Sequence, residues 1–271
     1  MRETAPATAE LATLESFALD LARAAAAITL PLFRGEYAHD DKGTEGAYDP
    51  VTDADRGAEA AIRRLIGQRF PDHGVIGEEY GEDRPDAEFV WVLDPVDGTR
   101  AFVSGLPLWA TLIALRHEGA PVIGVIAQPY LDEIFIGGPS GARLISRGGQ
   151  CALKTRTCSN LATAVLATTD VHLFQHGERE AFERVRSSVR LTRYGCDAYA
   201  YAMVALGRID LVVESGLKTW DYEALRPVVE RAGGVVTNWR GLAPGPDGRV
   251  LAAGDPRLHT RVAEIIGRFV D

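Results

Sequence analysis

One short segment, Asp-Pro-Val-Asp-Gly-Thr at residues 94–99, constrains this chain more than any other. It directly follows the apolar run 89–93, which predicts a buried strand. Asp94 and Asp97 therefore stand at the end of a strand, with a stiff proline between them. Gly98 and Thr99 can turn backbone N–H groups toward an anion. The segment predicts a site that holds hard cations beside a phosphate, and the alternative is a polar turn after a buried strand.

Further acidic residues lie at the ends of other predicted elements: Asp49, Asp53, Asp55, Glu78, Glu79 and Asp221. Carboxylate oxygens suit Mg²⁺, which prefers oxygen ligands and keeps waters and phosphate oxygens among them. Asp53 and Asp221 could instead be N-caps of the helices that follow them. Glu79 opens an acidic stretch that runs to Glu88, most of which is expected in a solvated loop.

The bulk composition excludes several classes of function. The chain has 271 residues, 46% of them apolar, and a formal net charge of −9. This charge argues against a nucleic-acid partner, while bound divalent cations would still allow anionic small substrates. No segment reaches the roughly 18 apolar residues of a membrane span. Three cysteines without CxxC spacing indicate reduced thiols, so a cytoplasmic protein is expected.

The first half of the chain predicts helices followed by a sheet. Helical spacing favours a helix over 9–33 and another from 51–53 to Phe70, with Thr52 or Asp53 as its N-cap. The polar segment 34–50 is expected to be a loop. A short strand at 75–76 and strands at 89–93, 109–116, 121–128 and 133–136 predict a meander-like sheet.

Strands and helices alternate in the second half. The predicted strands are 164–168, 190–193, 210–214 and 235–237, and the predicted helices are 178–188, 197–207, 221–232 and 256–269. Pro227 should kink the third of these helices or delay its start. The change of pattern predicts an N-terminal α+β subdomain, 1–146, with the metal and phosphate residues, and a C-terminal α/β subdomain, 147–271, that completes the site.

Taken together, these motifs resemble the inositol monophosphatase superfamily of Mg²⁺-dependent, lithium-sensitive phosphatases. The family's motifs occur in order along most of the chain, at Asp55, Glu78-Glu79, residues 94–99, Trp220-Asp221 and Gly233-Gly234. The resemblance implies a layered αβαβα sandwich of two subdomains, usually assembled as a homodimer. It also implies two or three Mg²⁺ ions in each active site.

The resemblance further implies roles for individual residues. The metal ligands would be Glu78, Asp94, Asp97, Asp221 and the backbone carbonyl of Val96. The catalytic residues would be Asp55, Glu78 and Thr99, of which Asp55 and Thr99 would position and deprotonate the attacking water. The N–H groups of Gly98 and Thr99 would bind phosphate. The substrate would contact Asp97, Asp197 and Glu214.

A narrower resemblance concerns the substrate. Residues 193–201 resemble the histidinol-phosphate phosphatase branch, and Asp197 stands where inositol-type members tend to have a small residue. A carboxylate there can pair with the amine or imidazole of histidinol, whereas inositol carries only hydroxyls. Asp197 could instead cap the helix over 198–207. Trp220 precedes Asp221, where many histidinol-type members have another residue. The assignment to the histidinol-type or the inositol-type branch therefore stays open.

These observations predict a phosphoric monoester hydrolase in which a metal-activated water attacks phosphorus in line. The favoured reaction converts L-histidinol phosphate and water to L-histidinol and phosphate, a step of histidine biosynthesis. The alternatives are inositol 1-phosphate or another small sugar phosphate, a bisphosphate ester, and a non-catalytic metabolite-binding protein of the same fold. A bisphosphate should require basic groups beyond the metal site, and the sequence has no dense basic cluster.

Overall fold

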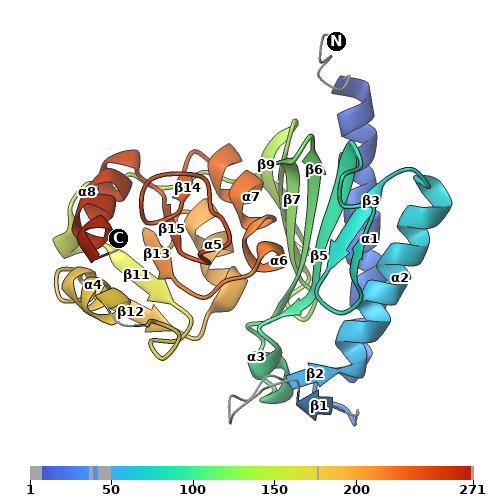
Figure 1. The fold of residues 1–271 in the computed structure, drawn as a ribbon, viewed down its shortest axis with the longest axis horizontal. Helices are drawn as coiled ribbons and strands as arrows, with labels where there is room; N and C mark the ends of the chain where they lie inside the picture. Colours follow the sequence, from blue (N-terminus) through green and yellow to red (C-terminus); the bar gives the residue numbers. More distant parts are fainter. Residues whose placement is uncertain (1–7, 37–38, 42–49, 176, 270–271) are drawn as a thin grey trace.

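Helices and sheets alternate in layers across the molecule (Figure 1). The computed structural model describes residues 8–36, 39–41, 50–175 and 177–269. The outer helices α1 (Thr8–Leu32) and α2 (Asp53–Arg69) cover one face of the first large sheet. The middle layer contains α5 (Asp197–Ala205), α6 (Thr219–Tyr222) and α7 (Leu225–Arg231), and the far layer contains α4 (Gly177–Arg186) and α8 (Pro256–Ile266). This is the αβαβα sandwich that the resemblance implies.

The first large sheet has eight strands in the order β10-β9-β8-β7-β6-β5-β3-β4. They are β3 (Gly74–Gly77), β4 (Gly81–Asp83), β5 (Phe89–Asp97), β6 (Ala110–His117), β7 (Ala120–Gln128), β8 (Glu133–Gly138), β9 (Gly141–Ser146) and β10 (Gly149–Ala152). The predicted meander corresponds to β5–β8, whose neighbours pair antiparallel. Strands β4, β9 and β10 were not predicted. Strands β4 and β10 are wholly exposed and so carry no hydrophobic pattern.

The second large sheet has five strands in the order β12-β11-β13-β15-β14. They are β11 (Val165–Thr168), β12 (Leu191–Tyr194), β13 (Leu211–Glu214), β14 (Val235–Thr237) and β15 (Val250–Ala253). Strand β15 was not predicted, although it lies between β13 and β14 and pairs antiparallel with both. All four of its residues are buried, and such a short apolar run has no periodicity that identifies a strand.

Two other predictions need correction. In the segment expected to be a loop, β1 (His39–Asp41) pairs with β2 (Pro50–Thr52), while residues 42–49 lie outside the described part of the chain. The helix expected over 221–232 is two helices, α6 and α7. Pro227 is the third residue of α7 and lies within its first turn. Backbone N–H groups in the first turn have no partner inside the helix, so proline is tolerated there. Smaller elements are α3 (Thr99–Val103), η1 (Leu161–Thr163) and η2 (Gly267–Phe269).

The predicted division of the chain between residues 146 and 147 stays a proposal. Strand β10 lies beyond it and still pairs with β9 in the first sheet. Among the described residues, no helix has both the length and the apolar character needed to cross a membrane.

Glycines on two strands let the middle helices approach the first sheet. A Cβ at Gly124 would lie 2.1 Å from the carbonyl oxygen of Ala224, and one at Gly137 would lie 2.1 Å from that of Pro227. Helix α7 therefore packs with its backbone directly on β7 and β8. This contact helps to set the position of the neighbouring α6 over the sheet.

Gly137→Ala should lower the free energy of unfolding by about 1–3 kcal/mol, because the added methyl overpacks this contact. Urea unfolding followed by circular dichroism measures the change. Gly148→Ala is the matched control, since a Cβ there meets only the Ser146 hydroxyl oxygen, at 3.7 Å. Equal midpoints for the two variants would contradict close packing of α7 on β8.

Candidate active site

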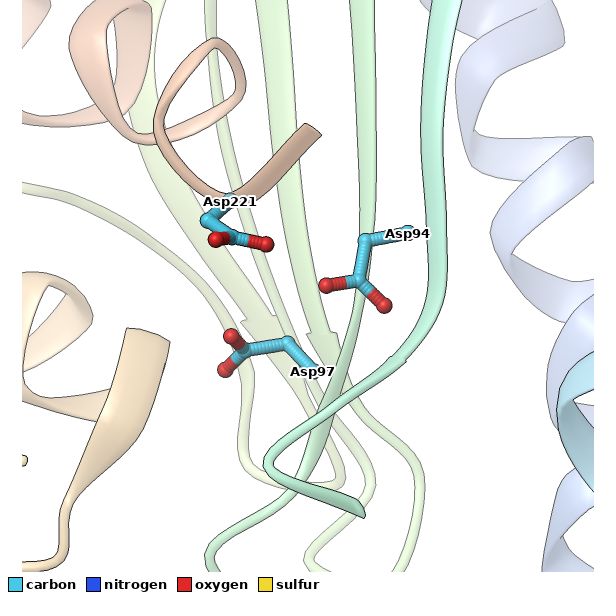
Figure 2. Close-up of side chains that lie close together, drawn as sticks. All are labelled: Asp94, Asp97 and Asp221. Atoms are coloured by element: carbon cyan, nitrogen blue, oxygen red, sulfur yellow. The ribbon is translucent and has the colours of Figure 1, made fainter. Parts of the chain in front are cut away.

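Three carboxylates from two distant segments meet where α6 contacts β5. Asp94 and Asp97 come from the end of β5 and Asp221 from α6, and Figure 2 shows their side chains turned toward one another. One carboxylate oxygen of each residue lies within 4.8 Å of the other two. Asp94 is buried and the other two are half-buried. The convergence of these acidic side chains that the sequence predicts is therefore present.

An irregularity in β5 places both aspartates on the same side of the strand. Residues three apart in a regular strand would point to opposite faces. Here the pairing of β5 with β6 shifts register between Asp94 and Asp97. Pro95 lies within the shift, its carbonyl accepting a hydrogen bond from the Thr111 hydroxyl at 2.8 Å. The N–H of Val96 donates to Asp94 Oδ1 at 3.1 Å, which fixes the orientation of that carboxylate.

The turn after β5 brings backbone close to the acidic cluster. Gly98 has a left-handed φ of 78° and is the N-cap of α3, a short helical turn. The Thr99 hydroxyl donates to the carbonyl oxygen of Val96 at 2.9 Å. A Cβ at Gly98 would lie 3.3 Å from Asp197 Cγ, so a larger residue would crowd Asp197.

Residues from these elements line one cavity of about 400 Å³. Every predicted site residue lines it except Asp55: Glu78, Asp94, Val96, Asp97, Gly98, Thr99, Asp197, Glu214 and Asp221. The structure thus places the residues together, while their individual roles stay predictions.

Asp55 is not among the residues that line the cavity, and its carboxylate takes part in the N-terminal cap of α2. Its Oδ2 accepts hydrogen bonds from the N–H and the hydroxyl of Thr52, at 2.8 and 2.5 Å. Thr52 is the N-cap of α2, and Asp53 is the first helical residue. Burial raises the pKa of Asp55 to about 6, and its charge is close enough to raise the pKa of Asp94.

Clustering of acids makes the site strongly electronegative. Burial, and after it the charge of Glu78, raises the pKa of Asp94 well above the usual carboxylate range. Burial and the neighbouring Asp197 do the same for Asp97. Burial raises the pKa of Asp221 to about 6, although the Lys218 N–H donates to it at 2.6 Å. A donor set made only of oxygen atoms, with mutually repelling charges, fits Mg²⁺.

Helix α5 and strand β13 supply two more carboxylates. Cys196 occupies the N-cap position of α5, and the N–H of Ala198 donates to Asp97 Oδ2 at 2.8 Å. The alternative in which Asp197 caps this helix is therefore wrong. Burial raises the pKa of Asp197 to about 6, against the opposing effect of Arg100. Burial also raises the pKa of Glu214 to about 8, although it accepts hydrogen bonds from Thr168 and Thr169.

Several residues that line or support the cavity were not predicted from the sequence. Arg100 and Lys218 are cations that line the cavity, and their positions next to Thr99 and near Asp221 were a usable signal. Tyr201 also lines the cavity, in the middle of a helix whose sequence gives no hint of it. Glu59 contacts the chain beside Glu78 from α2, and no motif marks it.

Comparisons with known proteins agree with this geometry. The inositol monophosphatase family matches residues 10–270. Bifunctional phosphatase IMPL2, chloroplastic, of Arabidopsis thaliana is 45% identical over 226 residues, which cover 79% of this chain and 64% of that protein. Histidinol-phosphatase of Mycobacterium tuberculosis is 36% identical over 217 residues, 79% of this chain and 83% of that one. The chain spans less than two thirds of the Arabidopsis protein.

A solved structure supports the same relationship. That of an inositol monophosphatase from Zymomonas mobilis has a TM-score of 0.84 and 40% sequence identity, covering 97% of this chain and 100% of that one. Both the resemblance and the layered fold predicted from the sequence are confirmed. The chain belongs to the inositol monophosphatase family of phosphatases.

Proposed function

We propose that this chain is a Mg²⁺-dependent phosphate monoester hydrolase whose substrate is L-histidinol phosphate. The observation that carries the chemistry is the carboxylate cluster of Asp94, Asp97 and Asp221 in one cavity with Gly98 and Thr99. When bound, two or three Mg²⁺ would activate a water and neutralise the charge of the phosphoryl oxygens. The cluster, with Glu78 and the Val96 carbonyl, would hold these ions.

The remaining groups would bind and orient the ester. The N–H groups of Gly98 and Thr99 would hold the phosphate, because α3 begins at this point. Thr99 would orient the attacking water through its hydroxyl. Asp55, with a pKa of about 6, would exchange its proton near neutral pH.

Carboxylates beyond the metal cluster favour a cationic leaving alcohol. Asp197 and Glu214 line the same cavity and come from the second subdomain. The amine and the imidazole of histidinol can each pair with a carboxylate, and inositol offers no cation. The Mycobacterium tuberculosis relative named histidinol-phosphatase supports this choice. The Zymomonas mobilis inositol monophosphatase supports inositol 1-phosphate as the second candidate.

Phosphate release from a panel of esters tests the proposal. The panel contains L-histidinol phosphate, inositol 1-phosphate, fructose 1,6-bisphosphate and phenyl phosphate, each with Mg²⁺ and with EDTA. We expect hydrolysis only with Mg²⁺ and the highest kcat/KM for L-histidinol phosphate. A clear preference for the inositol ester would defeat the choice of substrate, and no Mg²⁺-dependent release from any ester would defeat the hydrolase.

Asp197→Ala should raise KM for L-histidinol phosphate by about tenfold to a hundredfold, the value of a charge-assisted hydrogen bond. KM for phenyl phosphate, which has no cation, should change little. Asp247→Ala is the control, because this exposed carboxylate does not line the cavity. An equal rise for both esters would remove Asp197 from recognition of the leaving alcohol.

The resemblance also supports a homodimer, and the three cysteines without CxxC spacing support a cytoplasmic location. Sedimentation equilibrium of the purified chain tests the assembly, and a mass of one chain at micromolar concentration would contradict it.

A further inference from the structure

The hydroxyl of Tyr201 is a buried polar group that the fold leaves without a partner. Tyr201 lies in α5 and is 2% exposed. Within the part of the chain that the structure describes, its hydroxyl oxygen has no hydrogen-bond partner. Leaving such a group unsatisfied costs about 1–3 kcal/mol. Native proteins keep few of these groups, so each one calls for an explanation.

Packing alone does not explain the hydroxyl. The ring of Tyr201 belongs to the apolar core between the two large sheets. A phenylalanine would fill the same space without burying an unsatisfied oxygen. Tyr199, two residues earlier in α5, differs because its hydroxyl donates to Glu133 at 2.7 Å. Of these two tyrosines, Tyr201 is among the residues that line the active-site cavity and Tyr199 is not.

The surroundings of Tyr201 make it a donor. It shares the cavity with Glu214 of β13, Asp97 of β5 and Asp221 of α6. Burial and these three negative charges hold the pKa of Tyr201 well above its usual value, so the phenol keeps its proton. Glu214 already accepts hydrogen bonds from Thr168 and Thr169. A ligand atom with a free lone pair would give the phenol the acceptor that it lacks.

We propose that Tyr201 is a specificity residue whose hydroxyl donates a hydrogen bond to an acceptor atom of the leaving alcohol. This inference rests on the proposed function and deepens it. It adds an acceptor to the chemical class of the substrate, beside the cation that Asp197 and Glu214 would bind. A neutral imidazole fits, since one ring nitrogen donates and the other accepts. Histidinol would thus carry both a cation for the two carboxylates and an acceptor for the Tyr201 hydroxyl.

Tyr201→Phe tests the proposal at pH 8, where imidazole is neutral. KM for L-histidinol phosphate should rise about threefold to tenfold, as expected for the loss of a neutral hydrogen bond. KM for phenyl phosphate, whose leaving group has no second acceptor, should stay within about twofold. Without ligand, the melting temperature should stay the same or rise, because an unsatisfied hydroxyl is removed.

Tyr199→Phe is the matched control, which should lower the melting temperature and leave the ratio of the two KM values unchanged. A lower melting temperature for Tyr201→Phe, or an equal effect on both esters, would overturn the inference while leaving the hydrolase intact. Calorimetric titration of L-histidinol with phosphate and Mg²⁺ separates the two proposals further. If the parent turns over no ester, weaker binding of L-histidinol by Tyr201→Phe still supports the inference, and equal or absent binding overturns it.

Discussion

Asp94→Asn should reduce the Mg²⁺-dependent hydrolysis of every phosphate monoester by more than about a hundredfold, the upper end of what an outer-sphere partner of a metal contributes. Asp94 is the most buried member of the cluster, and its oxygens face both Asp97 and Asp221 (Figure 2). An amide oxygen remains but carries no charge, so attraction for a divalent cation is lost. Steady-state phosphate release at saturating Mg²⁺ measures the effect.

The same variant should fold as well as the parent or better. Asparagine can still accept the hydrogen bond from the Val96 N–H, so the local turn is retained. Removing one charge from a cluster in which burial and like charges raise the pKa of Asp94 relieves repulsion in the metal-free protein. Mg²⁺ should raise the melting temperature of the parent by mass action, and this shift should shrink in Asp94→Asn.

Asp86→Asn serves as the control for these measurements, since Asp86 is an exposed acid outside the cavity. It should keep full activity and the full Mg²⁺-dependent shift in melting temperature. Activity of Asp94→Asn within about tenfold of the parent would remove Asp94 from the metal site. A retained shift with lost activity would instead assign Asp94 to catalysis without ion binding.

Two members of the carboxylate cluster could be predicted because they lie at the end of one strand in a contiguous motif. Asp94 and Asp97 follow an apolar run that must be buried, and short-range rules place their side chains at its end. The convergence of Asp221 with them came only from the family resemblance. No local pattern specifies that α6 contacts β5, since this depends on packing between residues far apart in the chain.

Other features could not be predicted for physical reasons. Strand β15 is a four-residue apolar run, and its place between β13 and β14 in the second sheet follows from long-range pairing. Gly124 and Gly137 would usually weaken a strand, yet here they admit the backbone of α7. The unpaired hydroxyl of Tyr201 is visible only once the surrounding atoms are placed. These features therefore depend on long-range tertiary contacts, which local sequence propensity does not specify.

Glu59→Gln should weaken Mg²⁺ binding and activity by about tenfold to a hundredfold, as expected for a residue that orients a metal ligand. Glu59 is fully buried in α2 and accepts hydrogen bonds from the N–H groups of Glu79 and Tyr80, at 2.8 and 3.2 Å. A Cβ at Gly77 would lie 2.0 Å from Glu59 Oε1, so glycine is needed for this approach. Glu59 thus anchors the chain directly after Glu78 and packs against Gly77 before it.

A glutamine keeps the volume of Glu59 but has one acceptor oxygen in place of two, so one of the two N–H groups loses its partner. The turn that carries Glu78 should then loosen, and isothermal titration with Mg²⁺ measures the lost affinity. Arg63→Ala is the matched control. It removes the ion pair with Glu59, at 2.8 Å, but leaves both Glu59 carboxylate oxygens in place to accept from the backbone N–H groups. Arg63→Ala should therefore cost stability without a comparable loss of Mg²⁺ affinity. Equal losses of affinity in the two variants would mean that stability of α2, and not the orientation of Glu78, controls the site.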